Sequence, residues 1–388
     1  MSHKTQLSSL PEQQLLPLEV GQDAISTASG KVIHSITSKQ LAEHGSKRRY
    51  LIEEILPVGE PGCISGPSKS LKTTLAIDLA ISVASGKPFL GKFPVAETGN
   101  VLLISGESGV ETLCETAGRI CRAKGLELSQ LDESLRWATS LPRIPREIED
   151  IRRTIEQGKI KLLVIDPAYF ALREVGHDLA NATKIGAALE PLTEVCRELG
   201  CTVILVAHNR KGRGADQRRF DPPRLEEIAG AGIDQWVRHW LLIGPRDDWD
   251  AEAGKHWLWM VSGGSAGHAG EHALNIVEGK PSDEGGRTWQ CEVLGMAEAN
   301  RLKARQKTDR EAERSQRTKE GHVQKLRAAL QACVLGESKK QLREKTNLDD
   351  SAFKRAMATL IERGEARIES IKKGGRACQG YFPVIASG

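Results

Sequence analysis

One short segment, residues 62–74, constrains the fold of this chain more than any other. Gly66, Lys72 and Thr73 occupy fixed positions of the pattern G-x-x-x-x-G-K-[ST], and Leu71 stands where that pattern has its second glycine. A short apolar stretch leads into the segment, and a helix-forming run, residues 75–85, follows it. Strand, loop and helix in this order form the context in which such a loop binds phosphate.

The chemistry of the loop indicates its ligand. Backbone N–H groups at a helix N-terminus bind phosphate oxygens, and the helix dipole favours their negative charge. Lys72 would neutralise the β and γ phosphates, and the Thr73 hydroxyl would bind Mg²⁺. We therefore expect ATP and Mg²⁺ as cofactors. The expected nucleotide-binding residues are Gly66, Pro67, Ser68, Lys69, Ser70, Leu71, Lys72, Thr73 and Thr74.

Leu71 is the departure from the pattern. A leucine is strained wherever the backbone needs a positive φ, so we expect a turn that differs slightly from the usual one. Lys69 is then a candidate for a second phosphate contact. The alternative is an ordinary Gly-Pro-Ser turn before a helix with exposed lysines, and the strands that follow favour the phosphate loop.

The net charge of +4 is unevenly distributed along the 388 residues. Residues 321–388 carry 13 Lys and Arg against 7 Asp and Glu, a net charge of +6, which leaves about −2 for the rest of the chain. A nucleic-acid-binding surface would therefore be local. The eight cysteines form no C-x-x-C pair, the longest apolar runs have strand length, and the N-terminus is polar. We expect a reduced, cytoplasmic protein without a zinc cluster, a membrane span or a signal peptide.

Apolar runs alternate with helix-forming runs from about residue 59 to 244, which is typical of an α/β fold with a parallel sheet covered on both faces. The expected strands are 63–65, 101–105, 162–165, 202–207 and 240–243, the helices 73–84, 110–124, 146–156 and 180–199, and the antiparallel edge strands 257–261, 273–277 and 288–294. Residues 48–57 are interpreted as a core helix. The alternative is a segment that packs beside the nucleotide through Tyr50 or Leu51.

The composition divides the chain into four parts. The expected parts are a flexible leader (1–45), the α/β core (46–297), a charged linker that is helical or disordered (298–320) and a small C-terminal domain (321–388). The last has expected helices at 322–333, 339–346 and 351–363 and a hairpin of 366–371 with 380–384, the order of a winged helix.

The C-terminal domain carries candidate DNA contacts. Lys354 and Arg355 lie off the apolar stripe of the expected third helix, and Lys372, Lys373 and Arg376 form a basic wing. A helix of this kind enters a major groove while the wing holds phosphates. A protein–protein adaptor is the alternative for the same fold.

Three polar residues stand at the carboxyl ends of the expected strands, where an open α/β sheet binds its ligand. Glu107 would polarise the water that attacks the γ-phosphate, Asp166 would orient Mg²⁺ beside Thr73, and His208 would sense the γ-phosphate. The run of apolar residues before Asp166 is the Walker B form. Each of the three has a plainer alternative. Glu107 could be a solvated turn residue, Asp166 could cap a turn, and His208 could be a hydrogen-bonded histidine at a strand end.

With these residues in place, the chain from about residue 48 to 294 resembles the RecA-like hexameric ATPases, and within them the RepA-type and DnaB-type replicative helicases. The resemblance rests on residues 66–73 and 225–246 and on Glu107, Asp166 and His208. It implies a RecA-like P-loop NTPase core, a homo-oligomeric assembly that is a hexameric ring or a filament, and an arginine finger that enters the ATP site of the neighbouring subunit.

Arg246 holds the position of that finger, although residues 236–239 replace the usual Ala-Asp of the family. Arg238 is the second candidate, and an ordinary surface arginine is the plainer reading. The resemblance also implies that the loops after Asp166 and His208 line a central channel and contact single-stranded DNA. The expected DNA-binding residues of the second loop are Arg210, Lys211, Arg213, Arg218, Arg219 and Phe220. A basic surface loop without DNA is the alternative.

These features favour a DNA-dependent, ring-forming ATPase that moves along single-stranded DNA, a replicative-type helicase of a replicon or mobile element. The alternative is a DNA-binding regulator or recombination mediator that uses ATP as an assembly switch and does not unwind DNA. A kinase is disfavoured because the strand-end residues follow the RecA-like order and no lid for an acceptor substrate is evident.

Overall fold

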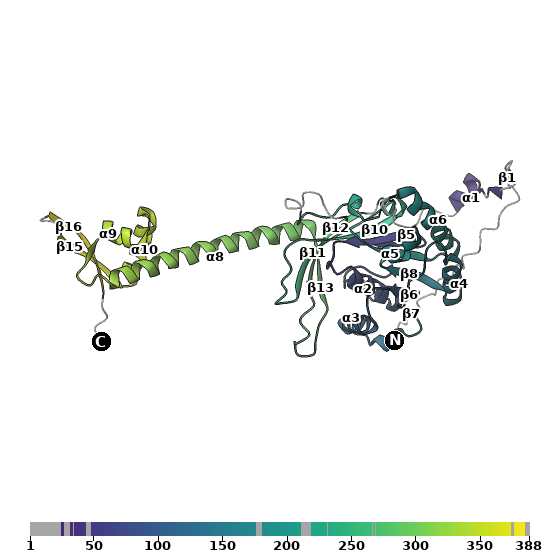
Figure 1. Ribbon diagram of the computed structural model, residues 1–388, viewed down its shortest axis with the longest axis horizontal. Coiled ribbons are helices and arrows are strands. Elements are labelled where there is room, and N and C mark those ends of the chain that lie inside the picture. Colours follow the sequence, from purple (N-terminus) through teal and green to yellow (C-terminus); the bar gives the residue numbers. More distant parts are fainter. Residues whose placement is uncertain are drawn as a thin grey trace, which may run out of the picture.

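The computed structural model describes two folded units joined by one long helix (Figure 1). The described residues are 25–26, 32–33, 35–43, 48–175, 181–210, 219–230, 232–265, 267, 269–373 and 376–384. Before residue 48 they comprise the short elements β1 (Ile25–Ser26), β2 (Val32–Ile33) and α1 (Ser38–Glu43). The rest of the expected leader, including residues 1–24, lies outside the described residues.

A nine-stranded sheet forms the larger unit, in the order β13-β12-β11-β10-β5-β9-β8-β6-β7. The strands from β10 to β7 in this order are all parallel to their neighbours, and β11, β12 and β13 are added antiparallel at one edge. Their bounds are β5 Pro61–Gly66, β6 Asn100–Ser105, β7 Leu135–Ala138, β8 Ile160–Asp166, β9 Thr202–His208, β10 His239–Pro245, β11 Lys255–Gly264, β12 Ala269–Val277 and β13 Gln290–Gly295. The predicted mainly parallel α/β fold with an antiparallel edge is confirmed, and β7 was not predicted.

Helices cover both faces of this sheet, which is why its strands are apolar on both sides. In β8, Leu162 and Val164 pack with the helices of one face, while Leu163 and Ile165 pack with those of the other. The first face holds α2 (Lys72–Ser85) and α3 (Val110–Ala123), and the second holds α4 (Ile148–Gly158) and α6 (Ala182–Leu199). Shorter elements are α5 (Ala168–Ala171), α7 (Ile233–Trp236) and the 3₁₀ turns η1 (Leu128–Leu131), η2 (Arg173–Val175) and η3 (Leu225–Glu227).

The core helix predicted over residues 48–57 is wrong: the segment is a small hairpin of β3 (Tyr50–Ile52) and β4 (Leu56–Pro57). Its apolar pairs at 51–52 and 55–56 suit a helix face and a hairpin equally well. Long-range backbone hydrogen bonds favour the hairpin over the helix, because the carbonyl of Leu51 accepts from the N–H of Ala96 at 2.9 Å. Leu51 is fully buried, so it presents no surface to a nucleotide.

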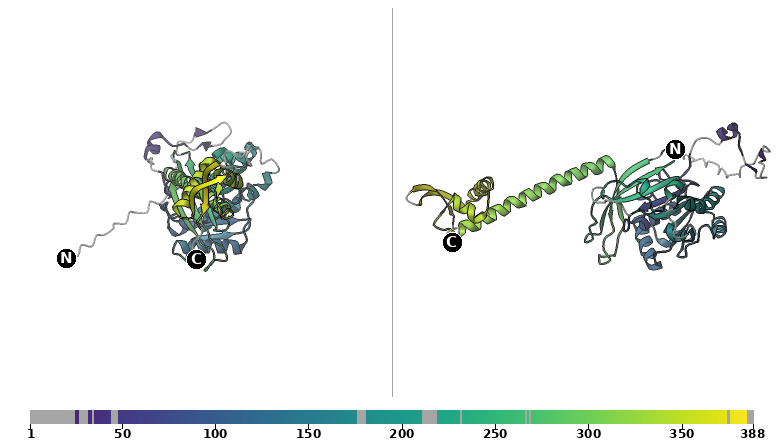
Figure 2. Two further views of the ribbon diagram at one scale, coloured as in Figure 1. Left: turned by 90° about the vertical axis from the view of Figure 1, so that its left-hand side faces the viewer. Right: turned by 45° about the horizontal axis from the view of Figure 1, so that its top comes forward.

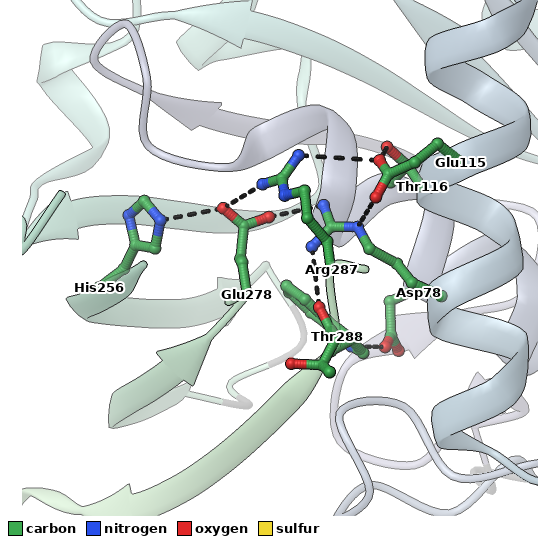
Figure 3. Close-up of polar contacts among 9 residues, drawn as sticks. Asp78, Glu115, Thr116, His256, Glu278, Arg287 and Thr288 are labelled. Carbon is green, nitrogen blue, oxygen red and sulfur yellow. Dashed lines mark hydrogen bonds and ion pairs between the residues drawn. The ribbon is translucent and has the colours of Figure 1, made fainter. Parts of the chain in front are cut away.

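The antiparallel edge is tied to the helices by a buried ionic cluster around Glu278 (Figure 3). Arg119 of α3 lies 2.5 Å from one carboxylate oxygen of Glu278, and Arg287 and His256 of β11 lie 2.9 and 3.0 Å from the other. Burial by itself would raise the pKa of Glu278, but the His256 hydrogen bond and the Arg119 and Arg287 charges outweigh burial and hold it at about 2.

A second buried carboxylate, Asp78 in the middle of α2, fixes that helix to its surroundings. It accepts from the indole N–H of Trp289 at 2.7 Å and from the backbone N–H of Leu90 at 3.1 Å, and Lys124 lies 3.0 Å away. Because an unpaired buried charge is costly, these three partners hold the carboxylate in one position.

The linker predicted over 298–320 and the first predicted C-terminal helix form one continuous helix, α8 (Met296–Gln331). Its sequence contains no proline and one glycine, and Ala, Glu, Lys, Arg and Gln dominate it, so intrinsic propensity supports a long helix. Both figures of the whole chain show α8 running from the edge of the sheet to the second unit (Figures 1 and 2).

The C-terminal unit contains α9 (Lys339–Thr346), α10 (Asp350–Glu362) and a three-stranded sheet. The sheet adds the unpredicted β14 (Glu337–Ser338) to the hairpin of β15 (Ala366–Lys373) and β16 (Arg376–Pro383). The end of α8, α9, α10 and the hairpin enclose a separate core that includes Leu326, Phe353 and Tyr381. Its assignment as a winged helix stays a prediction. None of the described helices of either unit is both long and apolar enough to cross a lipid bilayer.

Candidate functional site

The loop between β5 and α2 closes tightly on itself. The ammonium group of Lys72 donates to the Pro67 carbonyl at 2.7 Å, and the Ser70 hydroxyl donates to the same carbonyl at 2.8 Å. A Cβ on Gly66 would lie 2.5 Å from the Ile243 carbonyl, so only glycine fits at the start of the loop. Burial lowers the pKa of Lys72, whereas the charges of Asp166 and Glu107 act to raise it.

Leu71 adopts the left-handed conformation, with φ 60° and ψ 22°. This is the conformation for which the pattern reserves glycine, and a non-glycine residue loses roughly 1–2 kcal/mol in it. The side chain is half-buried and packs against the core of the α2 face, which offsets part of this loss. Lys69 also has a positive φ, of 63°. The chain therefore holds a left-handed backbone at position 71 without a glycine there, and the expected difference from the usual turn stays a prediction.

Two oxygen donors meet beside the loop. The Thr73 hydroxyl at the start of α2 donates to a carboxylate oxygen of Asp166, at the end of β8, over 2.5 Å. Asp166 is 4% exposed, and burial raises its pKa to about 6 despite the Thr73 hydrogen bond and the nearby Lys72 charge. The hydroxyl of Ser105, the register partner of Asp166 on β6, is buried and has no hydrogen-bond partner among the described residues.

This donor set fits Mg²⁺. The ion prefers hard oxygen ligands, binds through one or two protein oxygens and keeps several waters. Thr73 and Asp166 supply the oxygens, and the unpartnered Ser105 hydroxyl leaves hydrogen-bonding capacity at the same edge. Thr73 and Asp166 are thus the residues that would hold the ion.

Glu107 and His208 complete the edge, together with a tyrosine that the sequence analysis missed. Glu107 follows β6 and is exposed, and it accepts a hydrogen bond from the hydroxyl of Tyr169 in α5. The ring of Tyr169 lies 5.9 Å from the ring of His208, at the end of β9. Burial and then the Lys72 charge lower the pKa of His208, so its imidazole is neutral at pH 7. Lys72, Thr73, Glu107, Asp166 and His208 therefore gather at one edge of the sheet, as the sequence predicted from their strand ends.

Residues 31–214 match the family model of an AAA domain. The matched region, just under half of the chain, holds β5 to β9 and the side chains of Lys72, Thr73, Glu107, Asp166 and His208, and the match supports ATP binding and ATPase activity in general. β10 to β13, α8 and the C-terminal unit lie beyond the match. No curated protein matches the chain.

The AAA domain borders a cavity of about 630 Å³ on the β10 side of its phosphate loop. Residues 67–70 form one wall, and the segments 209–210, 219–227 and 244–258 supply most of the others. At its lining, the half-exposed indole of Trp249 is stacked on the imidazole of His256, with ring centroids 5.5 Å apart and planes 12° apart. The sequence analysis missed this pair, although a tryptophan soon after a strand end was a usable signal.

The two candidate finger arginines lie at opposite ends of β10. Arg246, at the carboxyl end, is 8% exposed, donates to the side-chain oxygen of Asn275 and lies over the ring of Trp259 at 5.6 Å. Burial lowers its pKa. Arg238 precedes β10 and is exposed. Arg246 would have to leave Asn275 and Trp259 to enter another subunit.

The basic loop after β9 is described only at its ends; Lys211, Arg213 and Arg218 lie outside the described residues. The guanidinium of Arg210 donates to the Ile228 carbonyl at 2.9 Å. Arg219 pairs with Asp248 at 2.8 Å and lies over the ring of Phe220 at 4.9 Å. The Phe220 carbonyl accepts from the indole N–H of Trp259 at 2.8 Å. The loop thus ends against β11 of the same chain.

In the C-terminal unit, the exposed Lys354 and Arg355 lie on α10. Lys354 pairs with Asp350 at 3.0 Å, and Arg355 donates to the Ser351 hydroxyl at 2.9 Å. Lys372, Lys373 and Arg376 lie on the backbone of β15 and β16 at the turn of the hairpin, where Lys373 is the register partner of Arg376. The placement of these residues on a helix and a hairpin follows the sequence prediction, and their DNA contacts stay a prediction.

Proposed function

We propose that this chain is a DNA-dependent ATPase motor of the RecA-like kind, a replicative-type helicase of a replicon or mobile element. The observation that carries the proposal is the convergence of Lys72, the Thr73–Asp166 pair, Glu107 and His208 at one sheet edge. Each of these groups has a task in phosphoryl transfer to water. A protein that only binds a nucleotide does not need the Thr73–Asp166 pair, Glu107 and His208 together.

The residues divide the reaction between them. Backbone N–H groups of residues 68–73 and the ammonium of Lys72 bind the phosphates. Thr73 and Asp166 would hold Mg²⁺, which would neutralise charge on the phosphates. Glu107 orients the water and accepts its proton as the water oxygen bonds to the γ-phosphorus and the bond to the bridging oxygen breaks. The neutral imidazole of His208 senses whether the γ-phosphate is present.

The proposed assembly is a homo-oligomeric ring in which an arginine of one subunit completes the site of the next. Arg246 and Arg238 are the two candidates for that arginine. The basic segment 210–220 would contact single-stranded DNA in the channel, and the C-terminal unit, with its net charge of +6, would contact duplex DNA.

A regulator that uses ATP only as an assembly switch is the second candidate. Two features favour it. The hydroxyl of Tyr169 donates a hydrogen bond to Glu107, and the basic C-terminal unit stands apart from the AAA domain at the far end of α8. This protein would bind ATP and duplex DNA with negligible turnover.

Steady-state ATP hydrolysis by the full chain, with and without single-stranded DNA, tests the proposal. We expect stimulation by DNA, a loss of at least about a hundredfold in kcat for Glu107→Gln because the proton acceptor is removed, and a comparable loss for Lys72→Ala. Lys87→Ala, an exposed lysine past the far end of α2, is the matched control and should retain wild-type turnover.

Two results would contradict the proposal. Turnover that survives both Lys72→Ala and Glu107→Gln would show that the site is elsewhere. Tight ATP binding without turnover on any DNA would favour the assembly switch.

A further inference from the structure

Tyr169 links the nucleotide site to an exposed aromatic surface. It lies in α5, directly after β8, and its hydroxyl donates to Glu107 on the neighbouring strand. Its ring is 39% exposed and stands next to that of Phe170, which is 38% exposed, with centroids 4.3 Å apart. The hydroxyl of Tyr169 therefore contacts Glu107, the proposed proton acceptor, while its ring is partly exposed to solvent.

The hydrogen bond to Tyr169 opposes the proposed role of Glu107. The hydrogen bond from the phenol fixes the orientation of the Glu107 carboxylate and occupies one acceptor site of its Oε1 oxygen. That bond must break or be shared before the carboxylate can turn toward a water and this oxygen can accept a proton. Burial, the hydrogen bond to Glu107 and the nearby carboxylates raise the pKa of Tyr169 to about 12, so the hydroxyl keeps its proton and donates across the working pH range.

The surroundings of Tyr169 offer its ring a second position. An apolar cavity of about 240 Å³ borders the ring and is also lined by Leu172, Ile185, Ala207 and His208. Movement into this space would separate the hydroxyl from Glu107 and keep the ring out of water. The exposed faces of Tyr169 and Phe170 are surfaces of the kind on which unpaired bases stack, at roughly 1–3 kcal/mol per base.

We propose that Tyr169 restrains Glu107 and that a base of single-stranded DNA removes the restraint by taking the place of the Tyr169 ring on Phe170, while Tyr169 moves into the apolar cavity. This inference rests on the proposed function, which supplies both ATP and DNA. Tyr169 is then a positioning residue: it acts on the reaction only through Glu107. In the absence of DNA the carboxylate is held by the phenol, and in its presence the carboxylate is free to orient the attacking water.

Tyr169→Phe tests the restraint, because it removes the hydroxyl and keeps the ring. We expect kcat for ATP without DNA to rise about tenfold, equivalent to about 1.4 kcal/mol, with an unchanged KM and a correspondingly smaller stimulation by DNA. Binding of a fluorescent oligothymidylate, followed by anisotropy, should be unchanged. Tyr381→Phe, which removes a hydroxyl bonded to Gln379 in the C-terminal unit, is the matched control and should leave kcat unaltered.

Two further variants separate restraint from a structural effect. In a Glu107→Gln background, Tyr169→Phe should no longer raise kcat, because the effect acts through Glu107. Phe170→Ala should raise the oligonucleotide concentration needed for half-maximal stimulation several-fold, because one stacking surface is lost.

An equal loss of kcat in Tyr169→Phe with and without DNA would overturn the proposal and make the phenol a support for catalysis. An unchanged kcat would overturn it as well. If Tyr169→Phe raises basal turnover while DNA stimulates neither protein, the restraint on Glu107 stands, and DNA as its release is overturned together with the DNA dependence of the proposed function.

Discussion

At the scale of single residues, Leu71 shows how the phosphate loop tolerates a departure from its pattern. Its backbone is left-handed, with φ 60°, and its side chain packs against the apolar core. Strain in the backbone and packing of the side chain thus act in opposite directions on stability. A pair of substitutions can separate the two contributions.

Leu71→Gly and Leu71→Ala both remove the packing, but only glycine removes the strain. We expect Leu71→Gly to be more stable than Leu71→Ala by about 1 kcal/mol in chemical denaturation, the reverse of the order inside a helix. Denaturant midpoints with equal m-values would check this. Alanine equal to or more stable than glycine would show that position 71 does not hold the left-handed conformation in solution.

The residues of the site were predictable where position along a strand decided them. Lys72, Thr73, Glu107, Asp166 and His208 all lie at loop or strand ends, and parallel strands bring such ends to one edge whatever their order in the sheet. Tyr169, Trp249 and His256 were missed because their contacts depend on side-chain direction across loops, which no spacing in the sequence encodes.

At the scale of elements, the Glu278 cluster joins the antiparallel edge of the sheet to α3, the helix that begins just after Glu107. Sequence patterns could place β11, β12 and β13 because their apolar residues alternate between turns. They could not place the hairpin of 50–57, which distant backbone hydrogen bonds to residues 94–97 hold in place, or β7, whose partner strand β6 lies more than 30 positions earlier in the chain. The ionic cluster was equally unpredictable, since it joins residues that are more than 150 positions apart.

Glu278→Gln should destabilise the larger unit, because it leaves the buried Arg119 and the half-buried Arg287 without this carboxylate. We expect a loss of about 3 kcal/mol in the free energy of unfolding at pH 7. The folded pKa of Glu278, about 2, lies below its ordinary value of 4.5, so its stabilisation is complete above pH 4.5 and is lost as the pH falls toward 2. The difference between wild type and variant should therefore shrink across that interval; a constant difference would contradict the assignment.

At the scale of the whole molecule, α8 determines how far the two folded units stand from each other. Its 36 residues correspond to a rod of about 54 Å. Residues 314–319 of the helix are exposed and belong to neither core, so the helix there depends on its own backbone hydrogen bonds.

Ser315→Pro removes one of these bonds and introduces a clash in the preceding turn, at about 3 kcal/mol. We expect the largest dimension in small-angle X-ray scattering to fall, because the C-terminal unit can then fold back, while the thermal unfolding of each unit is unaffected. Ser315→Ala is the control and should keep the wild-type dimension. The same dimension in the proline variant would show that α8 is not a single rod in solution.

The base of α8 has a mechanical consequence. Ala299 in its first turns packs with Trp259, the residue whose indole bonds Phe220 and underlies Arg246. Any shift of Phe220 or of Arg246 would thus reach the base of α8, which is the pivot of a long rod. A tilt of about 10° at that pivot displaces the far end of a 54 Å rod by about 9 Å, close to three base-pair steps of duplex DNA. A small displacement beside the nucleotide site would then become a displacement of several ångströms at the C-terminal unit.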